Sequence, residues 1–377
     1  MLTELRLTNF KAFDTLTLRC APITLLCGVN GTGKSTVIQA LLLLHQSAAS
    51  GALRPPDVQL ELAGDLAEIG SGRDALHEDA DTDVLSFRLR DGEVPGPCEM
   101  TFRVLPDEAG ESDQLRADHA DVDEGWWEMP LLGSNFHYVN AERVGPRKSY
   151  SHSETLVRRG DLGARGEYAL NYLSERGNTR LPSGDPRLEG AVGRRVLDGI
   201  DRWLGEVSPG AHLSFDKVVQ ADALVAGFSF DREGDVATRR FRATNVGFGL
   251  SYTLPVLTAL LARPPTLCLI ENPEAHLHPR GQTQVANLAV RAALAGVQVI
   301  VETHSDHFLD GVRIAVRDGL LRPQDVAIHY FERHGGRSKV TSPEVDADGR
   351  LSSWPVGFFD QHEDNLARLL SPKRRTR

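Results

Sequence analysis

The stretch Gly28-Val29-Asn30-Gly31-Thr32-Gly33-Lys34-Ser35 fits the phosphate-loop pattern G-x-x-x-x-G-K-[ST]. It follows the apolar run 23–27, which predicts a buried strand, and precedes a leucine-rich stretch at 34–46, which predicts a helix. Glycines let the backbone curve around an anion so that several N–H groups point inward, and the helix N-terminus adds its positive end. The sequence therefore predicts an α/β fold with a nucleotide phosphate site between this strand and this helix.

The phosphate loop supplies both a cation and a metal ligand. Lys34 is expected to reach the β- and γ-phosphates, and the Ser35 hydroxyl is expected to ligate Mg²⁺. The alternative, a glycine turn that binds no nucleotide, requires a chance match of the whole pattern with the correct flanks. The residues predicted to surround the phosphates are Asn30, Gly31, Thr32, Gly33, Lys34, Ser35 and Thr36.

A second strand with an acid at its end is predicted in TLCLIENPEAHLHP, residues 266–279. Apolar residues followed by an acid are typical of a buried strand that delivers a carboxylate to its carboxyl end, where open α/β sheets bind ligands. Glu271 is therefore predicted to hold the Mg²⁺ of the nucleotide, directly or through water. The alternative is a buried structural acid.

A third strand is predicted at 297–301, in VQVIVETHSDHF. His304 follows this strand directly, and a neutral imidazole there can hydrogen-bond the γ-phosphate or the attacking water. A lone histidine is more often structural, but its position after a core strand favours a sensor of the nucleotide state.

The remaining patterns predict an alternation of helices and strands along the chain. Strands are expected within 2–27, 56–105, 136–141, 212–244, 326–334 and 338–346, and helices over 165–205, 249–262, 279–295 and 306–317.

Composition limits the possible partners. The chain has 377 residues with 52 acidic and 42 basic side chains, so its net charge is −10. DNA-binding domains usually carry a basic excess, so a DNA contact would need a local patch, a partner or an oligomer. Nine acids lie in 107–128, which is expected to be a solvated insertion loop. No apolar run approaches the roughly 18 residues of a membrane span, and no signal peptide is visible, so a soluble cytoplasmic protein is expected.

These motifs together resemble a known superfamily. LTNFKAF (7–13), the phosphate loop, IENPEAHLHP and VETHSDHF look like the ABC-type ATPase heads of RecF, SMC and overcoming-lysogenization-defect proteins. With NVGFGLSYTLP (245–255) and the terminal WPVGFFDQ, the chain resembles a family of bacterial AAA/ABC ATPases of uncharacterised role. The resemblance implies an ABC-type P-loop ATPase head with a mixed central sheet, an N-terminal antiparallel β-subdomain and a helical/β insertion.

The order of the motifs predicts one composite head rather than separate domains, because the phosphate loop and the acidic strand should share a sheet. Its expected parts are an N-terminal lobe (1–140), an inserted helical/β region (141–240), a lobe with the signature, acidic strand and His304 (241–345), and a tail (346–377). Without sustained heptads before Gly247, no long SMC arm is expected, and too few residues follow His304 for an appended nuclease domain.

The resemblance assigns two further groups of residues. Asn9, Phe10 and Lys11 match a strand-turn that lies near the base or ribose. Gly247, Gly249 and Ser251 match the signature segment, which touches the γ-phosphate held by the opposite protomer. A glycine-rich turn that opens a helix is itself an anion site, although a plain helix cap is the alternative.

One residue departs from the superfamily pattern. Many heads have a second acid directly after the acid that corresponds to Glu271, and this second acid orients the attacking water. Here Asn272 occupies the position, and an amide can position water but cannot accept its proton. Glu274 is the candidate replacement, and otherwise hydrolysis is expected to be slow.

The resemblance implies an ATPase that uses ATP and Mg²⁺, forms a homodimer or higher oligomer through shared nucleotide, and gates a protein effector such as a nuclease in anti-phage defence or DNA maintenance. The alternative is a non-catalytic module that ATP locks into an assembly, and a small-molecule phosphotransferase is a third reading. Arg143, Arg147 and Lys148 form a basic stretch that either contacts phosphate or DNA or makes structural salt bridges.

Overall fold

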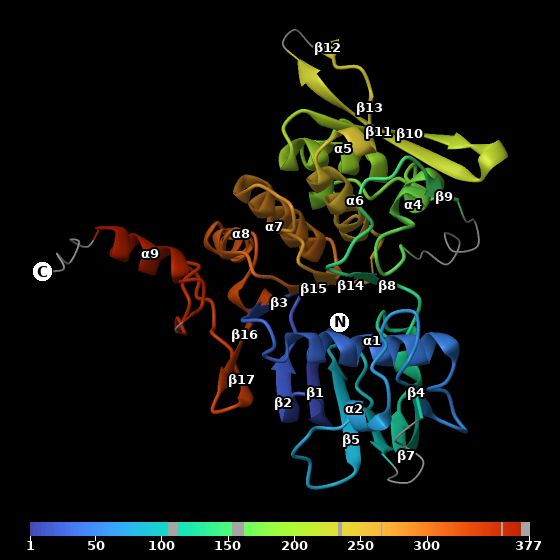
Figure 1. Ribbon diagram of the computed structural model, residues 1–377, viewed down its shortest axis with the longest axis vertical. Helices are drawn as coiled ribbons and strands as arrows, with labels where there is room; N and C mark the ends of the chain where they lie inside the picture. The colour runs from blue at the N-terminus through green and yellow to red at the C-terminus, as the bar shows by residue number, and fades with distance from the viewer. Residues whose placement is uncertain (105–111, 153–161, 233–235, 265, 356, 371–377) are drawn as a thin grey trace, which may run out of the picture.

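The computed structural model describes residues 1–377 except 105–111, 153–161, 233–235, 265, 356 and 371–377. The described strands form three sheets that follow one another along the long axis of the molecule (Figure 1). No described helix has the length and apolar character that a membrane crossing needs.

The central sheet carries the phosphate loop. Its strand order is β17-β16-β3-β15-β14-β8, and all neighbours are parallel except the antiparallel pair β16 and β17, so the sheet is mixed as expected. The strands are β3 (Ile23–Gly28), β8 (Phe136–Val139), β14 (Thr266–Glu271), β15 (Val297–Glu302), β16 (Val326–His334) and β17 (Arg337–Thr341).

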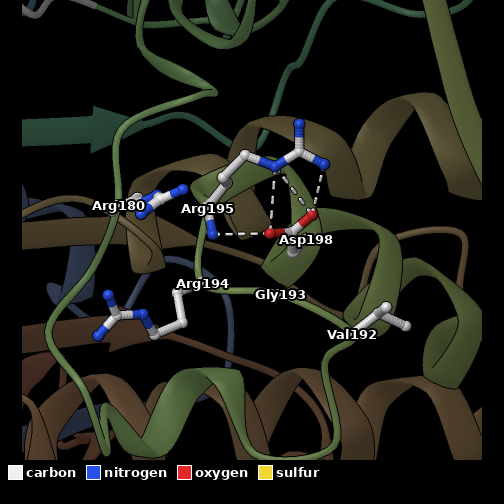
Figure 2. Close-up of a pocket in the computed structure, with 6 residues that line it drawn as sticks. All are labelled: Arg180, Val192, Gly193, Arg194, Arg195 and Asp198. Carbon is white, nitrogen blue, oxygen red and sulfur yellow. Dashed lines mark hydrogen bonds and ion pairs between the residues drawn. The ribbon is translucent and has the colours of Figure 1, made fainter.

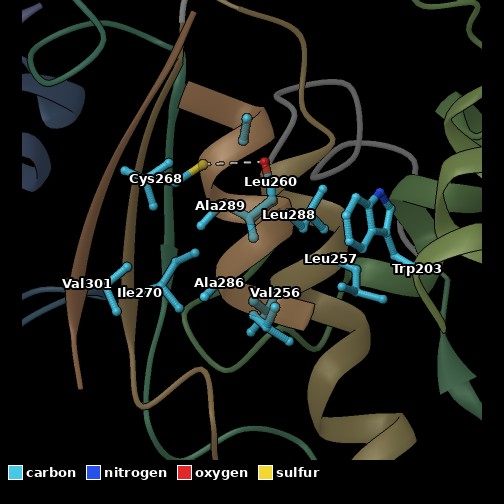
Figure 3. Packing of buried hydrophobic residues seen from close by; sticks show 14 of the residues in the cluster. Trp203, Val256, Leu257, Leu260, Cys268, Ile270, Ala286, Leu288, Ala289 and Val301 are labelled. Atoms are coloured by element: carbon cyan, nitrogen blue, oxygen red, sulfur yellow. Dashed lines mark hydrogen bonds between the residues drawn. The ribbon is translucent and has the colours of Figure 1, made fainter. Parts of the chain in front are cut away.

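Both faces of β3, β14 and β15 are buried, which explains the nearly continuous apolar runs of these strands. Cys268, Ile270 and Val301 point toward α6 (Phe248–Leu260) and α7 (Pro279–Leu294), with Trp203 of α5 (Val196–Val207) behind them (Figure 3). The alternate residues of these strands, such as Leu269, point to the other face of the sheet and pack in the core that contains α1 (Lys34–Ser50). The phosphate-loop strand is therefore fixed from two sides.

The N-terminal sheet is antiparallel and has the strand order β2-β1-β5-β6-β7-β4. Helix α1 lies between it and the central sheet (Figure 1), and their side chains share one core. The elements are β1 (Leu2–Phe10), β2 (Phe13–Arg19), β4 (Gln59–Glu61), α2 (Gly72–Ala75), β5 (Val84–Asp91), β6 (Cys98–Arg103), β7 (Gln114–Val122) and the 3-10 helix η1 (Glu124–Glu128).

The prediction of a solvated loop at 107–128 is wrong for the described residues 112–128. Strand β7 pairs with both β6 and β4, and the Trp126 indole is buried and donates to the carbonyl of Gly96 at 3.0 Å. Only Leu115 of β7 is fully buried, because this strand exposes most of its polar side chains to water. The apolar alternation that would have revealed the strand is therefore almost missing. Residues 107–111 lie outside the described part.

The described part of the inserted region contains a small sheet and the α-helices α4 (Ala169–Arg176) and α5. Strand β11 (Ala223–Arg232) pairs with β9 (Tyr150–Ser151), β10 (Ala211–Val218), β12 (Val236–Ala237) and β13 (Phe241–Arg242). The continuous helix expected over 165–205 is instead α4 (Ala169–Arg176) and α5 (Val196–Val207). Glycines and prolines in 177–193 prevent a continuous helix. Within this segment, the buried Arg187 donates hydrogen bonds to the carbonyl oxygens of Leu260 and Ala262.

The remaining elements complete the chain. Helix α8 (Asp306–Arg317) follows β15 as expected, and α9 (Gln361–Leu370) extends away from the body at the C-terminal end (Figure 1). The four cysteines are buried and free. The other 3-10 helices are η2 (Pro186–Leu188), η3 (Val219–Ala221), η4 (Ala243–Asn245) and η5 (Pro323–Asp325).

Candidate functional site

Three strands of the central sheet end at one edge and bring polar residues together there. Strand β3 ends at Gly28, β14 at Glu271 and β15 at Glu302, and the parallel register places Glu271 beside Glu302. The carboxyl edge of an open α/β sheet is its usual ligand site. The phosphate loop and both acids therefore face the same region.

The phosphate loop needs glycine at two positions. A β-carbon on Gly28, whose φ is +137°, would lie 2.1 Å from the carbonyl oxygen of Phe331 in β16. A β-carbon on Gly33 would lie 2.7 Å from the Phe13 ring. Between them, the Thr32 hydroxyl donates to the carbonyl of Val29 at 2.7 Å. Close packing against β16 and β2 thus fixes the loop from both ends.

Lys34 opens α1 at the inner side of this loop. Its Nζ donates to the carbonyls of Gly28 and Val29 at 2.8 and 2.9 Å and lies 3.6 Å from Glu302 Oε1. Burial lowers the pKa of Lys34, and Glu302 opposes that shift. The next residue, Ser35, is exposed, whereas the Thr36 side chain is buried.

Glu271 ends β14 with its carboxylate held by a neighbouring strand. The Tyr138 hydroxyl of β8 donates to Glu271 Oε1. Burial raises the pKa of Glu271, and the bond from Tyr138 and the charge of Arg143 oppose this rise. Tyr138 was not predicted as a site residue, although the expected strand at 136–141 contained it.

Arg143 is a buried cation that supports the chain after Glu271. Its Nη2 donates to the carbonyl oxygens of Glu271 and Asn272, and the residue is 1% exposed. Burial lowers its pKa to about 10. These bonds hold the backbone after Glu271, whereas Arg143 Nε and Nη1 are buried without a hydrogen-bond partner. Arg147 and Lys148 are exposed.

Asn272 turns the chain sharply after β14. It has a φ of +43°, which asparagine tolerates better than most residues, and its N–H donates to the Glu302 carbonyl at 2.8 Å. Its Oδ1 is buried with no hydrogen-bond partner.

Glu274, the candidate replacement for the absent acid, ties two segments together. Its Oε2 accepts from the Thr303 hydroxyl at 2.9 Å, and its Oε1 accepts from the His304 N–H at 2.7 Å. Burial raises the pKa of Glu274. Both carboxylate oxygens are therefore engaged in positioning the loop after β15.

Glu302, like Tyr138, is a site residue that was not predicted from the sequence. It is 8% exposed, its Oε1 lies 3.6 Å from Lys34 Nζ and 3.9 Å from His304 Nε2, and its Oε2 is buried without a hydrogen-bond partner. Burial raises its pKa to about 7, with Glu271 adding to the rise and Lys34 opposing it. The signal was present in VQVIVE, which repeats the apolar-strand-then-acid pattern of TLCLIE.

His304 lies at the rim of this cluster. Its side chain is 39% exposed, and burial, followed by the charge of Lys34, lowers its pKa. A neutral imidazole is therefore favoured at neutral pH, in the form that can accept a hydrogen bond.

The turn between β1 and β2 adjoins the phosphate loop, but its residues have different surroundings. The Phe10 ring is fully buried against Phe87, so the ring itself offers no surface to a nucleotide. The Asn9 amide is used within the N-terminal sheet, donating to the Val84 carbonyl at 2.9 Å. Lys11 is half-buried, and burial lowers its pKa.

The structure does not bring the signature segment to the phosphate loop of the same chain. Among the described elements, α6 packs mainly against α4, α5, α7, β8 and β14. A β-carbon on Gly249 would lie 2.7 Å from the His276 carbonyl, and Ser251 is buried with an unpartnered hydroxyl. Gly247, the N-cap of α6, is exposed, and nothing lies within 4 Å of the place of a β-carbon.

A separate surface cavity of about 410 Å³ lies in the inserted region (Figure 2). Arg195, one of its lining residues, forms an ion pair with Asp198 at 2.7 Å. No residue of the phosphate loop or of the acidic cluster lines this cavity, so it is distinct from the site. Its lining residues are Arg180, Val192, Gly193, Arg194, Arg195 and Asp198.

The side chains at the sheet edge fit a nucleotide with Mg²⁺. A glycine cradle that a β-carbon would fill, a buried lysine and an exposed hydroxyl at a helix N-terminus suit phosphate oxygens. Hydroxyl and carboxylate oxygens are the ligand types that Mg²⁺ takes from proteins, so Ser35 and Glu271 are the residues that would hold it.

Three family models match separate parts of the chain. An AAA ATPase domain model matches residues 1–84, and a model described as an AAA domain, putative AbiEii toxin, Type IV TA system, matches residues 172–310. A model of a protein of unknown function, DUF3696, matches residues 321–369. A search of curated proteins gave no match.

Solved structures match over nearly the whole chain. An SMC head bound to the C-winged helix domain of ScpA has 16% identity and a TM-score of 0.52, covering 91% of this chain and 98% of that one. An SMC head with an extended coiled coil from Pyrococcus furiosus, bound to the C-terminal domain of ScpA, has 14% identity and a TM-score of 0.51, covering 98% and 99%. The chain has the fold of an SMC ATPase head.

A third SMC head, with a coiled coil and joint from Pyrococcus yayanosii, has 12% identity and a TM-score of 0.51 and covers 90% of this chain and 96% of that one. The SMC-head fold confirms the predicted class, an α/β P-loop ATPase head. The AAA models cover the phosphate loop in one match and the signature, Glu271 and His304 in the other.

Proposed function

We propose that this chain binds ATP with Mg²⁺ between two copies, hydrolyses it slowly to ADP and phosphate, and thereby gates a partner protein. The observation that carries this proposal is the meeting of the phosphate loop, Glu271, Glu302 and His304 at one sheet edge. Lys34 and the loop N–H groups bind phosphates, Ser35 and Glu271 hold the metal, and His304 senses the γ-phosphate.

The second half of the nucleotide site comes from the other copy. In the ABC-type heads that this chain resembles, the signature segment of one protomer closes on the nucleotide of its partner. Here the N-terminus of α6, a 13-residue helix, is exposed at Gly247 and Phe248. Such a helix N-terminus favours an anion, and two identical contacts of this kind satisfy a two-fold dimer.

The partner is proposed from the resemblance. Two of the similar SMC heads were solved bound to parts of ScpA, so heads of this fold can bind another protein. For this chain, we propose an effector such as a nuclease, acting in anti-phage defence or DNA maintenance.

A non-catalytic role has one specific observation in its favour. The residue after Glu271 is Asn272, which cannot accept a proton from water. In that case ATP would lock an assembly without being turned over. Formation of ADP by the purified chain decides between the two functions.

If two copies share the nucleotide, two similar substitutions at Gly247 should affect dimerisation differently. Gly247→Asp places a negative charge where the partner's phosphate would dock, whereas Gly247→Asn has the same shape without the charge. Both residues are good N-caps, and Gly247 has a φ of −58° with free space around it, so both variants should fold.

Light scattering after gel filtration, with a non-hydrolysable ATP analogue and Mg²⁺, measures the effect. We expect dimers for the wild type and Gly247→Asn, and dimerisation weakened at least about tenfold for Gly247→Asp, which corresponds to roughly 1.4 kcal/mol. Equal dimerisation of the three proteins would refute the shared nucleotide site.

A further inference from the structure

We infer that Glu302 is a catalytic residue that orients the attacking water and accepts its proton, in place of the acid that is absent at Asn272. This inference rests on the proposed hydrolysis of ATP. It adds to the site a carboxylate that the superfamily resemblance does not assign.

Glu302 stands between the groups that bind the terminal phosphate. Strand β15 lies between β3, which leads into the phosphate loop, and β14, which ends at Glu271. The Glu302 carboxylate ends this middle strand, 3.6 Å from Lys34 and 3.9 Å from His304. A water between this carboxylate and the γ-phosphate would therefore lie within the cluster.

One oxygen of Glu302 is free for that water. Its Oε1 faces Lys34, whereas its Oε2 is buried and has no hydrogen-bond partner. A buried carboxylate oxygen without a donor is unfavourable, and such groups in native proteins usually mark a catalytic role or a bound water or ion. Glu302 Oε2 can therefore accept a hydrogen bond from the attacking water.

The neighbouring side chains are less suited to this task. Asn272 is an amide, and both oxygens of Glu274 accept hydrogen bonds from the 303–304 segment. Glu271 accepts from Tyr138 and is the metal ligand of the proposed function. Among these carboxylates, Glu302 alone has an oxygen identified as buried and unpartnered.

Hydrolysis at Glu302 makes one bond to the γ-phosphorus and breaks another. The water oxygen forms a bond to the γ-phosphorus while the bond between the γ-phosphorus and the β–γ bridging oxygen breaks. One water proton passes to Glu302 Oε2, and the products are ADP and inorganic phosphate. Glu302 afterwards returns the proton to solvent.

The experiment compares ATP binding with ATP turnover in single and double variants. For Glu302→Gln we expect turnover at least 100-fold below that of the wild type, with the affinity for a fluorescent ATP analogue changed less than about threefold. Glu332→Gln, a half-buried glutamate on β16, is the matched control and should retain wild-type turnover. Thermal melting of each variant reports whether it is folded.

The double variant Asn272→Glu/Glu302→Gln tests whether an acid at position 272 can replace Glu302. Restoring an acid at position 272 should raise turnover at least tenfold above that of Glu302→Gln alone. If Glu302→Gln hydrolyses ATP at the wild-type rate, or loses ATP binding together with turnover, the inference is wrong and the proposed ATPase stands. If the wild type itself shows no Lys34-dependent hydrolysis, the proposed function fails and the inference fails with it.

Discussion

Replacing Lys34 by alanine is expected to lower ATP turnover by at least about 100-fold, the usual effect of removing a positive or hydrogen-bonding group that stabilises a phosphoryl transition state. The Lys34 ammonium is buried within its own loop, 2.8 Å from the Gly28 carbonyl and 3.6 Å from Glu302. No other lysine opens α1, so nothing on this helix would replace its charge. Phosphate release at saturating Mg-ATP measures the effect.

The control for this substitution is Lys217→Ala, which removes an exposed lysine from β10 in the inserted region. We expect its turnover to equal that of the wild type. Thermal melting should show that Lys34→Ala remains folded. Equal phosphate release by the wild type and Lys34→Ala would exclude ATP hydrolysis at the phosphate loop.

Replacing Gly28 by alanine is expected to cost about 3–5 kcal/mol of the free energy of unfolding, since it combines a disfavoured backbone conformation with overpacking. The β-carbon would lie 2.1 Å from the Phe331 carbonyl, and β16 cannot move away because it is hydrogen-bonded to β3 along its length. Urea unfolding followed by circular dichroism measures the change.

Gly31→Ala is the matched control within the same loop. Its φ of +75° also disfavours alanine, but nothing lies within 4 Å of the added β-carbon. We expect a cost of about 1–2 kcal/mol, that of the left-handed conformation alone. If both variants lose the same stability, the close approach of β16 to Gly28 does not constrain the loop.

The central sheet was predictable because its strands are buried on both faces. Apolar runs bounded by a glycine loop or an acid gave β3, β14 and β15 nearly to the residue, and α8 was predicted at its observed bounds. The phosphate loop followed from its pattern and its flanks. A strand that is buried on both faces is apolar at nearly every position, so it can be recognised without knowing which face would be exposed to water.

Other features depend on contacts between distant segments, which the sequence does not display. Strand β7 was missed because its partners supply the hydrogen bonds while its own side chains are mostly polar. Arg143 could be read as a phosphate ligand until its carbonyl partners, 128 and 129 residues away, were known. Glu302 is an exception, because its signal was present in VQVIVE, but the strand was predicted to end at Val301 and only His304 was assigned a role after it.

ATP hydrolysis at a site shared by two copies is detected by mixing two inactive variants. Lys34→Ala keeps the signature segment, and Gly247→Asp keeps the phosphate loop. In a two-fold dimer that contains one copy of each, one of the two nucleotide sites has both intact parts. We predict that the mixture releases phosphate well above the sum of the two variants measured separately, and a mixture no more active than that sum would contradict the account.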